Sequence, residues 1–449
     1  GRLERRALSQ LGEVARLRVN PRKVFYGWWL VGVSGSVMVI STTPMFHAMG
    51  LWFVALEHAF GWSRTQLSLA FAFTRIEGGI LGPIEGYLVD RFGTRRLVFI
   101  GMTIMGIGWI LFSQIQNITI FGWIFRDLWM FYLVYMIIAL GQGLGSWLPL
   151  MTMLNNWFNR HRAKAMGFSN SVSRIGTLAL IPAIAWAIDP RFDRIGWEKA
   201  VIIIGVVVLV TVFPLTKMIR NRPEDYGLLP DGDKPQEPVA DQATGQSPTR
   251  SRTDDQDFTL RQALMTPSFW LISVGHGFTS MILIAMMAHL APMMDDRGYS
   301  LQTSAFVITA YTAVSMIFQI VGGFVGDRVP KRYALFVFTW IQASGVFLLT
   351  FGAASLPVAY GFALLFGIGF GGRNPLTVSI RGEYFGRKSF GKIMGISQVP
   401  MNILLLSAPV YAGFIRDTTG DYTLAFAPLA AINMLGGLLF LFALPPKLK

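Results

Sequence analysis

The feature that most constrains this chain is a series of apolar runs, each long enough to cross a lipid bilayer. A transmembrane helix needs about 20 apolar residues, and within lipid a helix satisfies its own backbone hydrogen bonds. We therefore predict an all-α membrane protein with twelve transmembrane helices, six on each side of a polar interval. The runs lie near residues 26–56, 64–90, 97–116, 130–156, 163–188, 197–218, 268–293, 301–327, 333–353, 357–382, 391–415 and 423–444.

Composition and charge agree with a membrane protein. Hydrophobic residues make up 53% of the 449 residues and charged residues 14%, with a mean hydropathy of +0.48, which is too apolar for a soluble domain. The net charge of +14 would suggest nucleic-acid binding in a soluble protein. Here most Lys and Arg residues lie on one side of the predicted spans, together with both termini. The positive-inside rule therefore predicts cytoplasmic termini and leaves no basic surface for nucleic acid.

The two sets of spans are copies of one another. The segment Gly86-Tyr-Leu-Val-Asp-Arg-Phe-Gly-Thr-Arg-Arg96 lies between the second and third spans, and a degraded copy follows at the same place in the second half. Because each half has an even number of spans, the halves share one orientation and form two pseudo-symmetric six-helix bundles, residues 24–218 and 263–449. The matched residues are Gly86 and Gly323, Asp90 and Asp327, Arg91 and Arg328, Arg95 and Arg332, and, before the second span of each half, Gly61-Trp-Ser63 and Gly298-Tyr-Ser300.

Three segments fall outside the predicted spans. Residues 1–23 combine basic residues with apolar residues near helical spacing, which predicts an amphipathic helix on the cytoplasmic membrane surface. Residues 219–262 are rich in proline, charged and turn-forming residues, which indicates a cytoplasmic linker, mostly disordered. An elongated outside loop is expected near residues 117–129. The chain has no cysteine, which excludes disulfides and thiolate metal sites, and we expect no metal and no cofactor.

The motif, the repeat and the twelve spans together resemble the major facilitator superfamily over essentially the whole chain. Tyr26-Gly27-Trp28, Trp157-Phe-Asn-Arg-His-Arg-Ala-Lys-Ala-Met-Gly167 and Arg222-Pro-Glu-Asp-Tyr-Gly227 are similar to its bacterial monocarboxylate and oxalate/formate transporter-like branch. The resemblance implies a monomeric transporter of the bacterial inner membrane that works by alternating access. Members of that branch tend to carry a basic residue in span eight. Leu301–Val325 has no charge here, so an anion site must be built differently.

The motif after span two carries the candidate cytoplasmic gate. Asp90 ends a helix beside basic residues at the headgroup level, where a carboxylate can pair with a guanidinium group or with the positive end of a neighbouring helix. The resemblance implies that Asp90 holds the cytoplasmic side shut against span eleven, with Asp327 and Arg328 as a second latch. The alternative is that these charges only anchor the loop at the membrane surface. The gate residues are Gly86, Asp90, Arg91, Gly93, Arg95, Arg96, Asp327 and Arg328.

Three basic residues lie inside the predicted spans, namely Arg75, Arg174 and Arg373. Each costs about 2.5–3.5 kcal/mol to insert, and the spans contain only two clear acids, Glu77 and Glu85. One positive charge is left over, which favours an anionic substrate. Arg75 and Glu77 point about 200° apart on a helix. Either Arg75 binds substrate while Glu77 is structural, or Glu77 carries a proton while Arg75 bonds a neighbouring helix.

Neighbouring polar residues complete the candidate site. Asn170 lies one turn before Arg174 on the same helical face, and Asn374 follows Arg373 directly. His276 lies in span seven, which usually lines the cavity in the superfamily that the chain resembles. The candidate substrate-binding residues are Arg75, Arg174, Arg373, Asn170, Asn374 and Gln142, and the candidate proton carriers are Glu77, Glu85 and His276.

These features predict a secondary transporter for a small organic anion, expected to be a carboxylate, with coupling to a proton or to a counter-anion left open. The alternative is proton-driven export of drugs or other amphiphilic compounds, which would depend on Glu77 and Glu85. An enzyme is not expected, because the sequence has no metal-binding His-Glu-x-x-His pattern, nucleophile elbow or phosphate-binding glycine loop.

Overall fold

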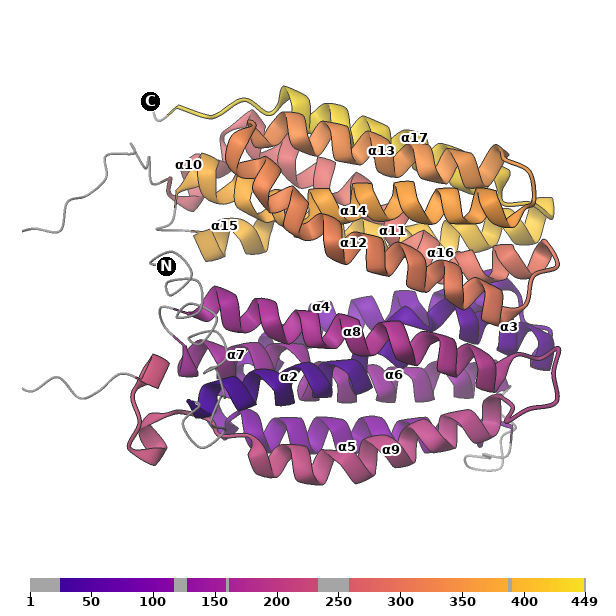
Figure 1. The fold of residues 1–449 in the computed structure, drawn as a ribbon, viewed down its shortest axis with the longest axis horizontal. Coiled ribbons are helices and arrows are strands. Elements are labelled where there is room, and N and C mark those ends of the chain that lie inside the picture. The colour runs from indigo at the N-terminus through magenta and orange to yellow at the C-terminus, as the bar shows by residue number, and fades with distance from the viewer. Residues whose placement is uncertain (1–24, 117–126, 159–160, 233–257, 387–389, 448–449) are drawn as a thin grey trace, which may run out of the picture.

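The computed structural model describes residues 25–116, 127–158, 161–232, 258–386 and 390–447, without the side chains of residues 75–83, 86, 90, 162–163 and 390–392. These residues form two bundles of helices that lie side by side (Figure 1). We call the end at which α2 (Tyr26–Thr42) begins and α17 (Thr423–Phe442) ends the termini end, and the opposite end the far end. The bundles lie closer together at the far end than at the termini end (Figure 1).

The N-terminal bundle contains six membrane-length spans, of which the first and the fourth are interrupted. Span one consists of α2, a five-residue segment of wider π-type helix and α3, and span four consists of α6 and α7. The elements after α2 are η2 (Thr43–His47), α3 (Met49–Phe60), α4 (Arg64–Phe92), α5 (Thr94–Phe112), α6 (Asp127–Gly145), α7 (Trp147–Trp157), α8 (Arg162–Ile188) and α9 (Trp197–Met218).

The C-terminal bundle also contains six membrane-length spans, but its interruption lies in span eleven, between α15 and α16. A short helix, α10, precedes its first span. The elements before α17 are α10 (Leu260–Leu264), α11 (Pro267–Asp296), α12 (Leu301–Arg328), α13 (Lys331–Phe351), α14 (Leu356–Phe385), α15 (Phe390–Ser397) and α16 (Val399–Thr419).

The lengths and composition of these helices confirm the predicted all-α membrane fold. Within the described residues, 11 spans are long and apolar enough to cross a bilayer. The remaining span is α4, which has 29 residues and is long enough to cross, but carries Arg75, Glu77 and Glu85 near its middle. Many of the exposed side chains are large and apolar, as a lipid-facing surface requires, among them Val210, Phe213, Ile320, Ile403 and Phe442.

The turn before the second span of each half has the same structure, as the duplicated sequence predicts. Gly61 and Gly298 both adopt a positive φ, of 68° and 86°, a conformation that glycine tolerates without strain. Ser63 then accepts a hydrogen bond from Gln66 N at the start of α4. Ser300 accepts one from Thr303 N at the start of α12. These side-chain caps satisfy backbone donors that a helix start leaves free.

The described flanks of the polar interval pack on different bundles. The first flank lies on the N-terminal bundle, where the Arg220 carbonyl accepts from Trp157 Nε1 at 2.8 Å. The second flank lies on the C-terminal bundle, where Phe258 N donates to the Phe385 carbonyl at 3.0 Å. The predicted N-terminal helix, the middle of the linker and most of the elongated loop lie outside the described residues.

Glycine contacts bring helices α5 and α6 together. A Cβ atom on Gly101 would lie 2.6 Å from the Cα of Gly145, so neither position has room for a side chain. We expect Gly101→Ala to push the helices apart and to lower the free energy of unfolding by about 1–3 kcal/mol, the usual cost of overpacking. Thermal unfolding of the purified protein in detergent measures this.

Gly32→Ala is the matched control for this prediction. Gly32 also lies within a helix, and a Cβ atom there would meet no atom within 4 Å, so its unfolding temperature should stay the same or rise slightly, because alanine favours helix. Equal stability of the two variants would show that α5 and α6 do not depend on this close approach.

Candidate functional site

Charged side chains join the two bundles at the far end. Arg64, the first residue of α4, is only 2% exposed and donates to the two carboxylate oxygens of Asp296 at 2.6 and 2.8 Å. Arg416 donates to the same carboxylate at 2.8 and 3.0 Å. Glu57 accepts from Arg64 Nε at 2.9 Å. Asp296 and Arg416 belong to the C-terminal bundle, so Arg64 and Asp296 link one bundle to the other.

Two further carboxylates cap helix N-termini across the same interface. Asp417, at the end of α16, accepts from Arg64 N at 3.1 Å and from Thr65 N at 2.8 Å. Asp189, just after α8, accepts from Leu301 N at 3.0 Å. Each carboxylate lies at the positive end of a helix in the other bundle, where a negative charge is stabilised. Because α4 and α12 are matching helices of the repeat, these caps are related by the pseudo-symmetry.

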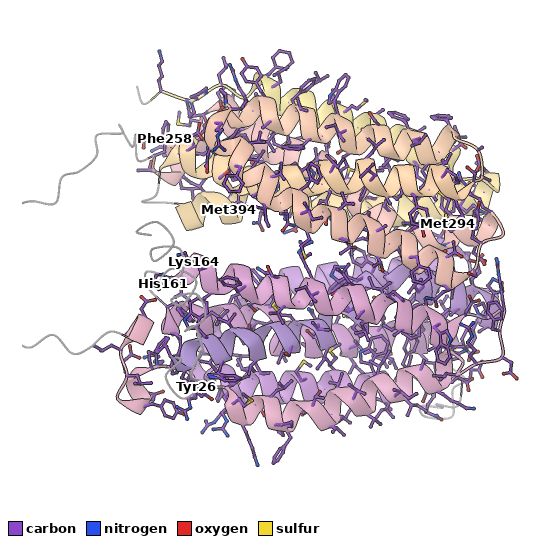
Figure 2. The ribbon with its side chains drawn as sticks, in the orientation of Figure 1. Tyr26, His161, Lys164, Phe258, Met294 and Met394 are labelled. Carbon is purple, nitrogen blue, oxygen red and sulfur yellow. The ribbon has the colours of Figure 1, made fainter. Side chains whose placement is uncertain are left out.

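A buried histidine continues the far-end interface. His289 of α11 donates from Nε2 to the Pro409 carbonyl at 2.8 Å and lies 3.1 Å from Ser68 Oγ in the other bundle. Its Nδ1 accepts from the Tyr422 hydroxyl at 2.9 Å. Met294 marks this region in Figure 2. These contacts make His289 a link between helices.

The predicted gate residues lie at the opposite, termini end. Arg91, Arg95 and Arg96 are exposed, and none of the ion pairs formed by the described side chains joins them to the C-terminal bundle. Gly93 has a φ of 78°, and the turn is held by Asn221, whose Oδ1 accepts from Arg95 N at 3.0 Å. Asp327 and Arg328 are also exposed, while the burial of Gly86 and the side chain of Asp90 lie outside what is described.

The described contacts therefore close the molecule at the far end. A cavity of about 410 Å³ at the termini end is lined by motif residues and by the start of the linker, including Arg91, Gly93, Arg96, Asn221 and Asp225. The motif thus contacts the linker in this conformation.

Arg174 lies where the bundles meet between the two ends. It extends from α8, is partly buried, and lies close enough to Tyr311 of α12 and to His47 of η2 to act on both electrostatically. No acidic residue forms an ion pair with it among the described side chains. Asn170, one turn nearer the termini end on α8, is exposed. The sequence-predicted residues Arg174 and Asn170 thus lie on one helix beside the interface.

Interrupted helices and hydroxyl pairs fix the position of Arg174. The Thr43 hydroxyl in η2 is 2.7 Å from the Thr177 hydroxyl of α8, one turn after Arg174. Ser41 Oγ is 2.6 Å from Ser146 Oγ, and Ser146 is the kinked residue between α6 and α7. Wider helical turns and broken spans are frequent at functional sites and at transporter binding sites. Here the breaks in spans one and four adjoin the helix that carries Arg174.

Arg373 is placed differently from Arg174. Its side chain is 1% exposed and lies inside the C-terminal bundle, where Nε donates to Gln342 Oε1 at 2.8 Å and Nη2 donates to the Thr279 carbonyl at 2.7 Å. Gln342 belongs to α13, on the side of α14 away from Arg174. The structure does not bring Arg373 and Arg174 together in this conformation. Asn374, beside it, is half-buried.

The acidic candidates belong to α4. The Glu85 side chain is 8% exposed, packs against Gly143 of α6, and its Oε1 has no hydrogen-bond partner among the described atoms. Gln142, next to Gly143, is half-buried. The side chains of Arg75 and Glu77 lie outside the described part of the chain, so the alternative roles predicted for them stay open.

Two buried cations, Arg64 and Arg381, are not singled out by the sequence analysis. Arg381 lies near the termini end of α14, where a basic residue is normally expected at the headgroups, yet it is 1% exposed. It contacts His276 of α11, with Nη2 3.2 Å from Nδ1. Helical spacing alone could have raised the question, because Arg381 lies about two turns after Arg373. Among the described residues, no group of acids and histidines could hold a metal ion.

Comparison with known proteins agrees with this architecture. The family model described as Major Facilitator Superfamily matches residues 24–308 and 269–449. The chain belongs to this superfamily. It is 23% identical over 417 residues to monocarboxylate transporter 13 from Bos taurus, covering 91% of this chain and 88% of that protein. It is 21% identical over 422 residues to the uncharacterized MFS-type transporter YcxA of Bacillus subtilis, covering 92% and 93%.

Solved structures show the same fold at low identity. The D-xylose-proton symporter aligns with a TM-score of 0.66 at 14% identity, over 94% of this chain and 96% of that one. A bacterial homolog of the human lysosomal transporter Spinster aligns with a TM-score of 0.63 at 14% identity, over 93% and 95%. Because the family model and the similar proteins named above are those of transporters, the protein is a multi-pass integral membrane transporter rather than an enzyme.

The far-end interface generates a direct prediction. Asp296→Asn removes the carboxylate that joins the buried Arg64 guanidinium to the other bundle and leaves it only the carboxylate of Glu57 in its own bundle. Breaking such a buried pair costs at most about 3–5 kcal/mol. We expect the far end to open more often. Because the chain has no cysteine, Ser68→Cys can report this opening, and Asp296→Asn should raise its reaction rate with a soluble thiol reagent at least tenfold.

Glu383→Gln is the control for this experiment. Glu383 pairs with Lys331 within the C-terminal bundle, so its loss should leave the labelling of Ser68→Cys unchanged. Unchanged labelling in Asp296→Asn as well would show that the ion pair with Arg64 does not hold the far end closed.

Proposed function

We propose that this protein is a secondary active transporter that moves a small organic anion, a carboxylate, by alternating access of its two bundles. The observation that carries the proposal is the Arg174 guanidinium, which lies at the interface of the bundles without an acidic partner among the described side chains. A charge at membrane depth is costly unless a partner or water stabilises it. A carboxylate substrate would supply that partner, and a guanidinium binds carboxylates with two parallel hydrogen bonds.

The surroundings of Arg174 suit a small anion. Tyr311 offers a hydroxyl donor, His47 adds a second polar ring, and Asn170 lies one turn away. Arg75, Arg373, Asn374 and Gln142 remain in the proposed binding machinery, with Arg373 supplying positive charge from within the C-terminal bundle. The similarity to proteins named monocarboxylate transporters supports a carboxylate among the possible anions.

We infer that the termini end faces the cytoplasm of a bacterial cell, because the basic residues gather on that side of the spans. With the far end closed by Arg64 and Asp296, the described conformation then faces inward. Asp90 and its neighbours would close the cytoplasmic end in the opposite conformation. A single chain contains both bundles and the interface, so the protein is proposed to work as a monomer.

Proton-driven export of amphiphilic compounds is the second candidate, and Glu85 favours it. A carboxyl group at membrane depth without a described partner is suited to taking up and releasing a proton. This candidate requires Glu85→Gln to abolish transport while Arg174→Gln is tolerated. The carboxylate proposal requires the reverse order of effects.

A thermal-shift screen tests the proposed function. The purified protein is heated with acetate, lactate, oxalate or succinate, and a ligand at 100 times its dissociation constant should stabilise it by about 2.7 kcal/mol. We expect at least one of these carboxylates to stabilise the parent protein. Arg174→Gln should remove the effect, because the amide cannot replace the charge.

Arg194→Gln is the matched control for Arg174→Gln. Arg194 is an exposed arginine of the far-end loop that stacks on Trp186 and Phe192, so its replacement should leave the carboxylate shift unchanged. If no carboxylate stabilises the parent, or if Arg174→Gln responds like the parent, the proposed anion site is wrong and export of amphiphilic compounds becomes the better-supported function.

A further inference from the structure

Arg381 is the centre of a second polar cluster in the C-terminal bundle. Its Nε donates to Ser397 Oγ at 2.7 Å, its Nη1 donates to the Thr377 carbonyl, and its Nη2 donates to His276 Nδ1 at 3.2 Å. The cluster joins α14, α15 and α11. A fully enclosed guanidinium group thus has only neutral hydrogen-bond partners.

The C-terminal bundle has no acid that could balance this charge. Every acidic residue of its sequence lies near one end of a helix or in a loop, and Glu383, the nearest to Arg381 in sequence, is exposed and bonded to Lys331. With Arg373, the interior of the bundle holds two guanidinium groups and no carboxylate. The acids of residues 258–449 are Asp295, Asp296, Asp327, Glu383, Asp417 and Asp421.

The contact between Arg381 and His276 determines where protons can lie on the imidazole ring. A guanidinium group can only donate hydrogen bonds, so His276 Nδ1 accepts and the ring proton lies on Nε2. The imidazole ring cannot take up a second proton, at Nδ1, while an N–H group of Arg381 donates to that atom. If His276 were protonated, its Nδ1–H and the N–H of Arg381 would be two donors facing each other, and both groups would carry a positive charge. Protonation therefore requires something to come between them.

A carboxylate meets that requirement. One of its oxygens can accept from Arg381 Nη2 while the other accepts from a protonated His276 Nδ1, so both donors are satisfied. We propose that Arg381 and His276 form a second carboxylate subsite, in which the anion and one proton bind together. The proton comes from water on the termini side and goes to Nδ1. The subsite thus takes up one negative and one positive charge, and its own net charge does not change.

This inference rests on the proposed function and decides the coupling that it leaves open. Arg174 binds the anion at the interface, whereas Arg381 and His276 make the binding depend on a proton. The coupling arises because Nδ1 of His276 can either accept from Arg381 or carry a proton, but not both. Without the anion, Arg381 donates to Nδ1 and prevents its protonation. Without the proton, Nδ1 offers the anion no second donor.

The ends of α15 and α16 offer a way into the subsite. Ser397 is the last residue of α15, and Pro400, which has no N–H group to donate back to α15, lies in the first turn of α16. Gly395 and Ile396 are exposed and His276 is partly exposed. Figure 2 shows Met394 of α15 on the side of the C-terminal bundle that faces the N-terminal bundle. Displacement of α15 would release Arg381 from Ser397.

No other described charge is placed to take over this role. The charged groups that act on His276 are Arg381 and Arg373 of α14. The other helices that pack against α11 carry their charged residues at their ends or have none, as in α17, and the ionisable residues in their middle are the neutral tyrosines Tyr311 of α12 and Tyr411 of α16. The residues at the ends are Arg261 of α10, Asp327 and Arg328 of α12, Lys392 of α15, Arg416 and Asp417 of α16, and Glu57 and His58 of α3.

Proton uptake on binding tests the inference. Titration calorimetry at pH 7.5 in buffers with different ionisation enthalpies gives the number of protons bound with whichever of acetate, lactate, oxalate and succinate stabilises the parent. We expect one proton for each anion bound at Arg381 and His276, which gives between about half a proton and one proton per anion overall, in the parent and in Arg194→Gln. His276→Gln should still bind the anion, because its amide can accept from Arg381 and donate to the anion, but should take up almost no proton.

Two variants of Arg381 separate charge from structure. Arg381→Gln should bind the anion about tenfold more weakly and take up almost no proton. Arg381→Lys should keep the proton uptake, because an ammonium group also only donates. The unfolding temperature of each variant without ligand shows whether it is folded. If Arg381→Gln does not fold, His276→Gln and Arg381→Lys still test the inference.

The outcomes distinguish the inference from the function on which it rests. If the anion binds in an Arg174-dependent manner without proton uptake, or if His276→Gln and Arg381→Gln take up as many protons as the parent, the inference is overturned and the proposed function stands. If no carboxylate binds, or Arg174→Gln binds like the parent, the proposed function fails and the inference fails with it.

Discussion

The ion pair between Arg64 and Asp296 is the contact on which the rest of this conformation depends. It joins the two bundles at one end, where Arg64 is almost completely enclosed and uses all three of its nitrogen groups on partners. A buried charge of this kind is stable only while its partner is present. The carboxylates of Asp417 and Asp189 repeat the same principle with helix N-termini in place of a guanidinium group. Closure of one end thus depends on polar contacts that can be exchanged, in addition to the apolar packing of α3 and α4 against α11 and α16.

Burying a charge is also costly for the arginines in the spans, and these arginines differ in the partners that stabilise them. Arg373 is surrounded by neutral oxygens within one bundle, and Arg381 by neutral oxygens and an imidazole. Arg174 lies between the bundles with no acidic partner among the described side chains. A guanidinium group between two moving bodies can bind a ligand in one state and release it in another. One enclosed within a single bundle changes its surroundings only when that bundle rearranges, as a displacement of α15 would do for Arg381.

Particular residues show how far the sequence could be read. The spacing of apolar residues predicted the spans, and the repeated turn at Ser63 and Ser300 predicted two equivalent helix starts, because these depend on local rules. Arg174 lies within a helix that the apolar spacing predicted, yet its neighbours Tyr311 and His47 come from distant segments. Arg381 was overlooked because its position along the span suggested the headgroup region. The polar contacts between bundles were expected at the motif, whereas the described ones lie at the far end. The same sequence has to form both sets, each in a different conformation.

The sequence by itself determined the membrane class, the twelve spans, the duplication and the presence of unbalanced positive charge within the spans. Each follows from hydropathy, spacing or counting, which need no knowledge of how helices pack. The tertiary structure decided which end is closed, which arginine faces the interface, and which atom of His276 is occupied by Arg381. These depend on contacts between segments far apart in the chain, and a difference of one helical turn or of about 100° around a helix axis changes every one of them.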